Sequence, residues 1–234
     1  MIDPRPFESL YNANHGWLNA RHHFSFADYH DDRRMGWGSV RVWNDDEIDA
    51  GAGFPPHPHA DMEIITYVRE GAITHQDSLG NKGRTEAGDV QVMSAGTGIR
   101  HAEYNAEAVK TTLFQIWVYP DARGHTPRWG AKPFPKADRS GRFVALASGF
   151  QEDIDEGALL IHTPARLMGA TLLTGQSETY APEKGRHVYL VLAAGRVNIN
   201  GLEFKARDGA AITDEDLLRI EALEDSEILL LDAH

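Results

Sequence analysis

The chain has 234 residues, which suits one large domain or two modest ones with a buried core. Hydrophobic residues make up 41% and charged residues 25% of it, as in ordinary globular proteins. The formal net charge of -12 argues against direct binding of nucleic acid, which normally requires a basic surface. The absence of cysteine excludes disulfides, thiolate nucleophiles and cysteine-based zinc or iron–sulfur sites.

The start of the chain, MIDPRPFESLYNANHG, lacks the basic and apolar regions of a secretory signal. No apolar run approaches the length needed to span a membrane. Together with the missing cysteines, these features predict a cytoplasmic protein without a membrane partner.

Short runs of strand-forming residues recur along the chain, separated by glycine, proline and Asn-Gly turn signals. In chain order they are Ser39–Trp43, Glu63–Val68, Val90–Ser94, Thr112–Tyr119, Arg142–Ser148, His187–Gly195 and Glu227–Asp232. No long amphipathic helix interrupts them. The pattern predicts an all-β fold, either a sandwich or a barrel.

The strands contain a weak internal repeat. Thr66–Ile73 leads through a turn to Ala87–Met93, and Tyr189–Val197 leads through a turn to Arg207–Thr213 in the same rhythm. We favour two copies of one β-fold over chance similarity.

A connector between the two copies is predicted at Arg128–Gly141, which is polar and rich in proline and glycine. We therefore expect an N-terminal unit over residues 1–130 and a C-terminal unit over residues 131–234.

The stretch FPPHPHADMEIITYV, residues 54–68, carries the clearest chemistry. Side chains at i and i+2 of a strand point to the same face, so His57 and His59 should point together. The same parity adds Asp61 and Glu63. The prolines before each histidine fix φ and remove backbone donors, which predicts a rigid stretch at the lip or edge of a sheet.

A second stretch, GTGIRHAEYN, places His101 and Glu103 at i and i+2. If the two stretches are neighbouring strands, three imidazoles and one carboxylate converge. Such a set suits a divalent Fe, Mn, Ni, Cu or Zn ion and can leave positions open for substrate or oxygen. A lone His-x-His is often surface decoration, so the second stretch is what favours a metal site. Spacing alone leaves open whether Glu63 or Glu103 is the carboxylate ligand.

These stretches resemble known motifs. GAGFPPHPHADMEIITYVREG resembles the first cupin motif, with a last gap one residue longer than usual, and GDVQVMSAGTGIRHAEYN resembles the second, without its usual proline. These departures, together with MSAGTGIRHAEYN and the LFQIWV strand, resemble the pirin-like bicupins, a cupin family that includes bacterial pirin-like quercetin dioxygenases. The similarity extends over nearly the whole chain.

The resemblance implies two stacked cupin (double-stranded β-helix, or jelly-roll) barrels, with metal only in the N-terminal one. It implies that His57, His59, His101 and Glu103 hold one divalent ion, usually Fe(II), with Mn, Ni, Cu, Co or Zn as alternatives. Glu63 is then expected beside the ligands, without binding the metal itself. The C-terminal unit has no His-x-His and is expected to lack a metal site.

The resemblance further implies a metal-dependent dioxygenase that cleaves a flavonol such as quercetin with loss of carbon monoxide. Its partners would be a small aromatic substrate and O2, and Glu103 or Glu63 would accept a proton. The alternative is a metal-bearing regulatory protein that acts through protein partners, which the acidic charge would suit. A ligand-sized cavity leading to the metal would favour the enzyme.

The remaining histidines are predicted to lie in the core, on the surface or at a pocket rim. His22 and His23 are adjacent, and a strand would send them to opposite faces, so they cannot both bind one ion there. The five tryptophans are predicted to be core or interface residues, with pocket lining as the alternative.

Overall fold

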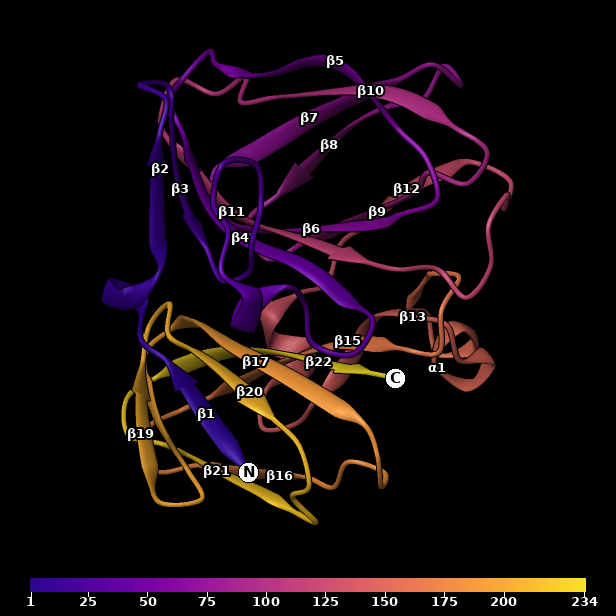
Figure 1. Cartoon of the computed structure of the whole chain (residues 1–234). Helices are drawn as coiled ribbons and strands as arrows, with labels where there is room; N and C mark the ends of the chain where they lie inside the picture. The colour runs from indigo at the N-terminus through magenta and orange to yellow at the C-terminus, as the bar shows by residue number, and fades with distance from the viewer.

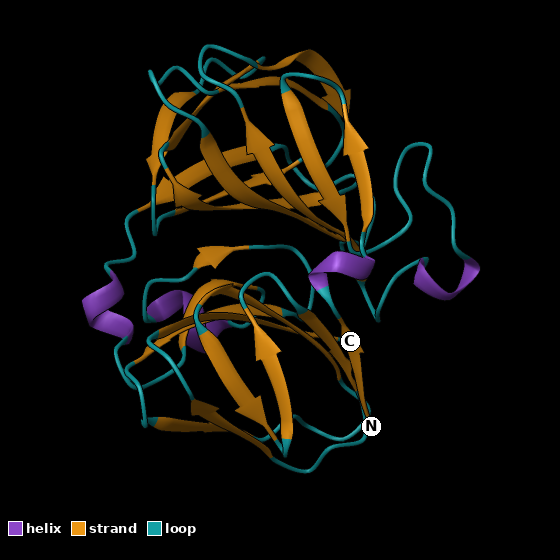
Figure 2. Ribbon diagram, turned by 90° about the vertical axis from the view of Figure 1, so that its left-hand side faces the viewer, coloured by secondary structure: helices purple, strands orange, loops and turns teal.

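The computed structural model describes all 234 residues and consists almost entirely of β-strands. The strands form two β-units stacked one above the other, as Figures 1 and 2 show. Each unit pairs a seven-stranded sheet with a four-stranded sheet. The prediction of an all-β fold of two stacked barrels is therefore confirmed.

The N-terminal unit encloses its interior between two sheets. Its seven-stranded sheet has the order β12 (Arg128–Lys132), β9 (Val90–Ser94), β6 (Glu63–Glu70), β11 (Thr111–Val118), β4 (Val40–Ile48), β3 (Leu18–His22), β2 (Tyr11–Asn14). Its four-stranded sheet has the order β5 (Gly53–His59), β10 (Ile99–Tyr104), β7 (Ala72–Asp77), β8 (Lys82–Glu86). The proline-rich strand β5 lies at the edge of its sheet, as the missing backbone donors predict.

The C-terminal unit repeats this arrangement. Its large sheet has the order β1 (Ile2–Arg5), β20 (Gly209–Ile212), β17 (His187–Ala194), β22 (Ser226–Ala233), β15 (Arg166–Leu172), β13 (Val144–Ser148), β14 (Leu159–Leu160). Its small sheet has the order β16 (Ser177–Tyr180), β21 (Leu218–Ala222), β18 (Arg196–Ile199), β19 (Leu202–Lys205).

Helical structure is confined to short segments, drawn in purple in Figure 2. They are α1 (Gln151–Asp155) and three 3-10 turns at Phe7–Ser9, Asp32–Arg34 and Lys136–Arg139. None of the helices is both long and apolar enough to cross a membrane.

The chain crosses between the units at its first strand. β1, indigo in Figure 1, pairs with β20 of the C-terminal sheet, with Ile2 opposite Ile212. β12 straddles the predicted boundary at residue 130 and pairs with β9 of the N-terminal sheet. The predicted range 1–130 thus includes one strand that belongs to the other sheet, because β20 offers a free edge that β1 completes. The exact division of the chain stays a prediction.

All seven predicted strands are present, and β4 is longer than the sequence indicates. It continues past Trp43 through the polar residues Asn44, Asp45, Asp46 and Glu47. The buried Asp45 carboxylate is paired with Arg69 and with Arg207 from the C-terminal unit. This pairing offsets the cost of burying its charge, and the strand can therefore continue.

The two large sheets face each other and share one core. This core is a cluster of 23 buried residues that includes Trp43, Tyr67 and Phe114 from the N-terminal sheet and Tyr189 and Leu229 from the C-terminal sheet. Each large sheet is therefore buried on both faces, by the opposite unit on one side and by its own barrel interior on the other.

Candidate metal centre

The interior of the N-terminal barrel contains a cavity of about 490 Å³. Its apolar walls include Trp17, Phe26, Phe54, Ile64 and Trp117. Its polar lining includes His22, Asn44, Asp46, His57, His59, His101, Glu103 and Gln115. The cavity has the size of pockets that hold small organic ligands, typically ~300–1,000 Å³.

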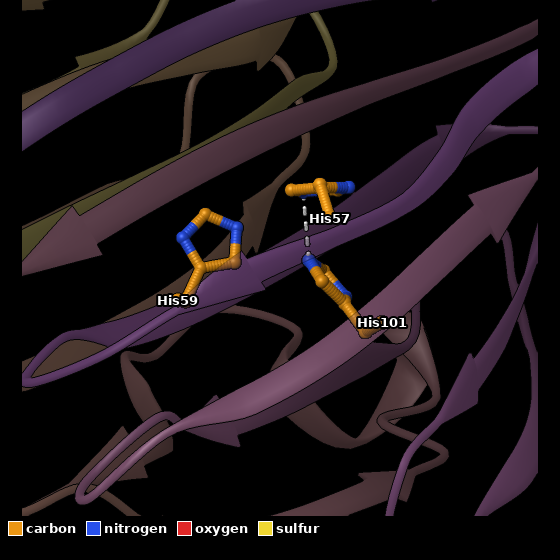
Figure 3. A group of neighbouring side chains, drawn as sticks. All are labelled: His57, His59 and His101. Carbon is orange, nitrogen blue, oxygen red and sulfur yellow. Dashed lines mark hydrogen bonds between the residues drawn. The ribbon is translucent and has the colours of Figure 1, made fainter.

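Three of the histidines that line this cavity lie close together, as Figure 3 shows. Strands β5 and β10 are antiparallel neighbours, and their register places His101 opposite His57. One ring nitrogen from each of His57, His59 and His101 lies within 4.8 Å of the others. The predicted neighbourhood of the two motif stretches is present, and it brings the three imidazoles together.

Hydrogen bonds fix the tautomers of two of these rings. His57 donates from Nδ1 to the Pro55 carbonyl oxygen over 2.8 Å, so in the neutral ring the lone pair is at Nε2. His101 Nδ1 lies 3.5 Å from His75 Nδ1, and His75 Nε2 lies 3.0 Å from Asp77 Oδ2. Because His75 Nε2–H donates a hydrogen bond to Asp77, Nδ1 of the neutral His75 ring is an acceptor, and His101 Nδ1 is the donor that faces it. The His101 Nε2 lone pair then also faces the cluster.

Two lone pairs thus face each other, because His57 Nε2 and His101 Nε2 are 3.1 Å apart. Burial, with His57 as the next cause, lowers the pKa of His101 to about 3, and burial likewise lowers the pKa of His59 to about 4. The His59 and His101 rings are therefore neutral near pH 7. Neutral imidazoles with opposed lone pairs fit a shared cation, so these residues suit a divalent transition metal.

Glu103 lies beside the three histidines in the barrel interior. One carboxylate oxygen lies within 4.8 Å of ligand nitrogens of His75 and His101. Gln91 donates to Oε1 over 2.6 Å and Gln115 donates to Oε2 over 2.8 Å, so the carboxylate is held in one orientation. Burial raises the pKa of the Glu103 carboxyl. Its role as a metal ligand stays a prediction.

Glu63 does not join this group. Its carboxylate accepts a hydrogen bond from Ser94 Oγ over 2.7 Å and lies 3.3 Å from His162 Nδ1 of the C-terminal unit. The expected parity from His57 to Glu63 is wrong, because the chain leaves β5 at His59 and turns through Asp61, whose φ is +48°. Glu63 then opens a strand of the opposite sheet and points toward the other unit.

His75 and Asp77 support His101 and are absent from the sequence-based site. Both side chains are buried, and the His75 ring stacks on Trp129 with centroids 4.8 Å apart. Although burial opposes it, hydrogen bonds from His75 and Asn81 lower the pKa of Asp77. The signal was present, because His75-x-Asp77 repeats the i, i+2 spacing of the two motif stretches on the strand paired with β10.

His22 and His23 lie on opposite faces of the chain, as predicted. His22 lines the cavity, and burial, with His15 next, lowers its pKa to about 4. His23 turns the other way, and its Nδ1 lies 2.9 Å from the Tyr189 hydroxyl of the C-terminal unit.

Comparisons with known proteins decide the family. The pirin family model matches residues 5–118, and a model described as the quercetinase C-terminal cupin domain matches residues 146–233. A pirin-like protein of Caulobacter vibrioides is 64% identical over the full length of both chains, and a quercetin 2,3-dioxygenase of Escherichia coli is 45% identical over 99% of this chain and 98% of that protein. This chain belongs to the pirin family.

Solved structures agree with this assignment. The bacterial pirin YhhW of Escherichia coli, in complex with nickel(II), superposes on this pirin with a TM-score of 0.93 at 43% identity, covering 100% of this chain and 99% of that one. The fold of the present pirin is therefore that of a bicupin, and relatives of the same family are named as dioxygenases of quercetin.

Proposed function

We propose that this pirin is a metal-dependent dioxygenase that cleaves a flavonol such as quercetin with loss of carbon monoxide. The observation that carries the proposal is the cavity of about 490 Å³ whose lining includes all three converging histidines. A ligand-sized space beside the metal ligands is what an enzyme needs and what a purely regulatory metal site does not. The cavity therefore favours the enzyme over the regulatory alternative.

The proposed ligands are His57, His59, His101 and Glu103, holding one divalent ion, with Fe(II) as the first candidate and Ni(II) as the next. When bound, this ion would lower the pKa of a coordinated substrate hydroxyl and offer open positions for substrate and oxygen. The nickel complex of the Escherichia coli relative supports a divalent transition metal at a site of this family.

The chain's own residues bind and orient the substrate. Trp17, Phe54 and Trp117 supply apolar walls for a flat aromatic ring and keep water from the reacting side of the cavity. The Glu103 carboxylate is the proposed acceptor of the enol proton, because it lies beside the histidines and lines the cavity. Glu63 has no contact with the cavity, so no part in this proton transfer is proposed for it.

The overall reaction balances without a further reductant. Both atoms of O2 enter the ring-opened ester, and one carbon of the heterocycle leaves as carbon monoxide together with its oxygen. The expected substrates are consequently aromatic enols with a carbonyl next to the hydroxyl.

The test is an oxygen-uptake assay on quercetin with protein purified anaerobically and then loaded with Fe(II), Ni(II) or no metal. We expect metal-dependent oxygen consumption with one carbon monoxide per O2, and its loss in His101→Ala. His30→Ala is the matched control, since His30 is exposed and pairs only with Asp32.

A full metal complement with no uptake on any flavonol would refute the dioxygenase and favour the regulatory alternative. Protein that binds no divalent metal at all would refute the ligand assignment.

A further inference from the structure

A row of polar side chains crosses the floor of the N-terminal barrel. Five adjacent strands of the large sheet each contribute one inward-facing polar residue at directly paired positions. The row runs His22 (β3), Asn44 (β4), Gln115 (β11), Thr66 (β6), Gln91 (β9). All five are at least nine-tenths buried. Burying such a polar row is costly unless each group finds a partner.

One half of the row has its partner. Gln91, Thr66 and Gln115 all donate to the Glu103 carboxylate, over 2.6, 3.4 and 2.8 Å respectively. Gln91 Oε1 in turn accepts from Thr85 Oγ1 over 3.0 Å. This half of the row therefore positions the carboxylate beside the histidines.

The other half has no such partner. His22 Nδ1 and Asn44 Oδ1 are buried without a hydrogen-bond partner within the chain. Asp46 follows Asn44 by two residues on β4, so it shares the inward face, and its Oδ1 is also buried and unpaired. These three side chains are 4%, 4% and 2% exposed, and all of them line the cavity that the histidine cluster lines.

The cavity is lined by two polar groups of different chemistry, the histidine cluster and the unpaired side chains His22, Asn44 and Asp46, and also by apolar side chains. The histidine cluster comes from β5 and β10 of the small sheet, and the unpaired wall comes from β3 and β4 of the large sheet. Aromatic side chains, among them Phe26 and Trp117, line the same cavity. An occupant that satisfies both groups is an aromatic molecule with a metal-binding oxygen pair at one end and further polar hydrogens elsewhere.

We propose that His22, Asn44 and Asp46 form a hydroxyl-binding wall that selects polyhydroxylated aromatic substrates over ring systems that carry only the metal-binding oxygens. The inference deepens the proposed flavonol dioxygenase and rests on it for the position of the metal-bound end. The Asn44 amide oxygen accepts from a ligand hydroxyl, and His22 Nδ1 can do the same in its Nε2-protonated form.

The state of Asp46 supports this wall. Burial, followed by the nearby carboxylates of Asp45 and Glu103, raises the pKa of Asp46 to about 8. A neutral carboxylic acid can donate as well as accept, so it suits a hydroxyl oxygen without placing an uncompensated charge inside the barrel.

The test compares two ligands that share the metal-binding end. Quercetin carries several further hydroxyl groups, whereas 3-hydroxyflavone carries none. Binding is measured by quenching of tryptophan fluorescence in nickel(II)-loaded protein without oxygen, so no turnover consumes the ligand. We expect Asn44→Leu to raise the Kd for quercetin at least about tenfold and to change that for 3-hydroxyflavone less than about twofold, since an unpaired hydroxyl is what the variant site leaves.

Thr112→Val is the matched control. Thr112 also lies on the large sheet with a buried unpaired hydroxyl, but it is absent from the cavity lining, so neither affinity should change. His22→Phe keeps a flat ring at the wall and should shift quercetin selectively in the same way, which preserves the test if Asn44→Leu fails to fold.

Each of the following results would refute the proposed hydroxyl-binding wall. Unchanged quercetin affinity in both variants would mean that the wall holds only water. Equal weakening of both ligands would mean a general loss of barrel packing, and absence of quercetin binding to the wild-type protein would remove the ligand class. Oxygen uptake on quercetin, with quercetin affinity unchanged in the wall variants, would refute the wall and leave the proposed dioxygenase standing.

By contrast, weaker quercetin binding in the wall variants, without oxygen uptake by the wild-type protein, would refute the dioxygenase and leave the wall standing.

Discussion

The two barrels have similar strand orders and differ in the side chains that their large sheets direct into the barrel interior. In the N-terminal barrel five paired positions carry histidine, asparagine, glutamine, threonine and glutamine. The corresponding row of the C-terminal barrel, across β13, β15, β22, β17 and β20, reads Ala145, Met168, Leu230, Leu190, Ala210. The first interior has a cavity, and the second is filled by an apolar cluster of 15 residues.

The comparison teaches that one strand arrangement can serve as site or as scaffold, according to its inward row. Apolar side chains fill the space and stabilise the barrel by burial. The polar side chains of the N-terminal row instead border a cavity, and their buried polar atoms need a carboxylate, a metal ion or a ligand as partner. The predictions that follow break or sharpen this contrast, from the largest expected effect to the smallest.

Leu190→Asn would introduce the N-terminal chemistry into the apolar barrel. We expect a loss of about 4 kcal/mol in unfolding free energy, because the variant loses buried apolar volume and gains an unpaired amide. Urea unfolding at 25 °C measures it. Leu202→Asn, on an exposed strand position, should cost under about 0.5 kcal/mol. A cost below about 1 kcal/mol at Leu190 would show that the C-terminal interior also admits water.

Glu103→Gln tests the half of the polar row that donates to the Glu103 carboxylate. Replacing the carboxylate removes a charge from the proposed ligand set and sets an amide against the Gln91 and Gln115 donors, so metal affinity should fall about 100-fold. Competition with a chelating dye measures it. Glu63→Gln is the control, and it should leave metal affinity unchanged because Glu63 contacts Ser94 and His162. The opposite ranking would make Glu63 the ligand.

His75→Phe tests the support behind His101. The phenyl ring can keep the stack on Trp129 but cannot accept from His101 Nδ1, so metal affinity should fall about tenfold. The same dye competition reports it, with exposed His30→Phe as the control. Unchanged affinity would mean that other contacts set the His101 orientation.

Acid should destabilise the fold through His23, which is buried between the two units. Burial, with the nearby Arg34 charge next, lowers the pKa of His23 to about 3, against about 6.5 in an unfolded chain. The unfolded state therefore binds more protons, and stability falls as pH drops from about 6.5 toward 3, with a slope approaching 1.4 kcal/mol per pH unit from this residue. His23→Phe should show a shallower slope in urea unfolding between pH 7 and 5. Equal slopes would contradict the low pKa.

Much of the fold was predictable because the local signals agree. Strands β9 and β17 follow from β-branched and apolar runs bounded by glycine, and the proline-flanked His57 and His59 follow from i, i+2 parity on one strand. Glu63 was misplaced because parity holds only within a strand, and the turn at Asp61 begins a new one.

The sequence by itself determined the all-β class, the absence of cysteine chemistry and the placement of His57 and His59 on one strand face. Only the tertiary structure decided which distant residues meet. His75 reaches His101, Glu63 turns to His162, and β1 joins the C-terminal sheet through strand pairing that no local spacing encodes. The polar row is the clearest case, since its five members are spread from residue 22 to residue 115 and become neighbours only through sheet register.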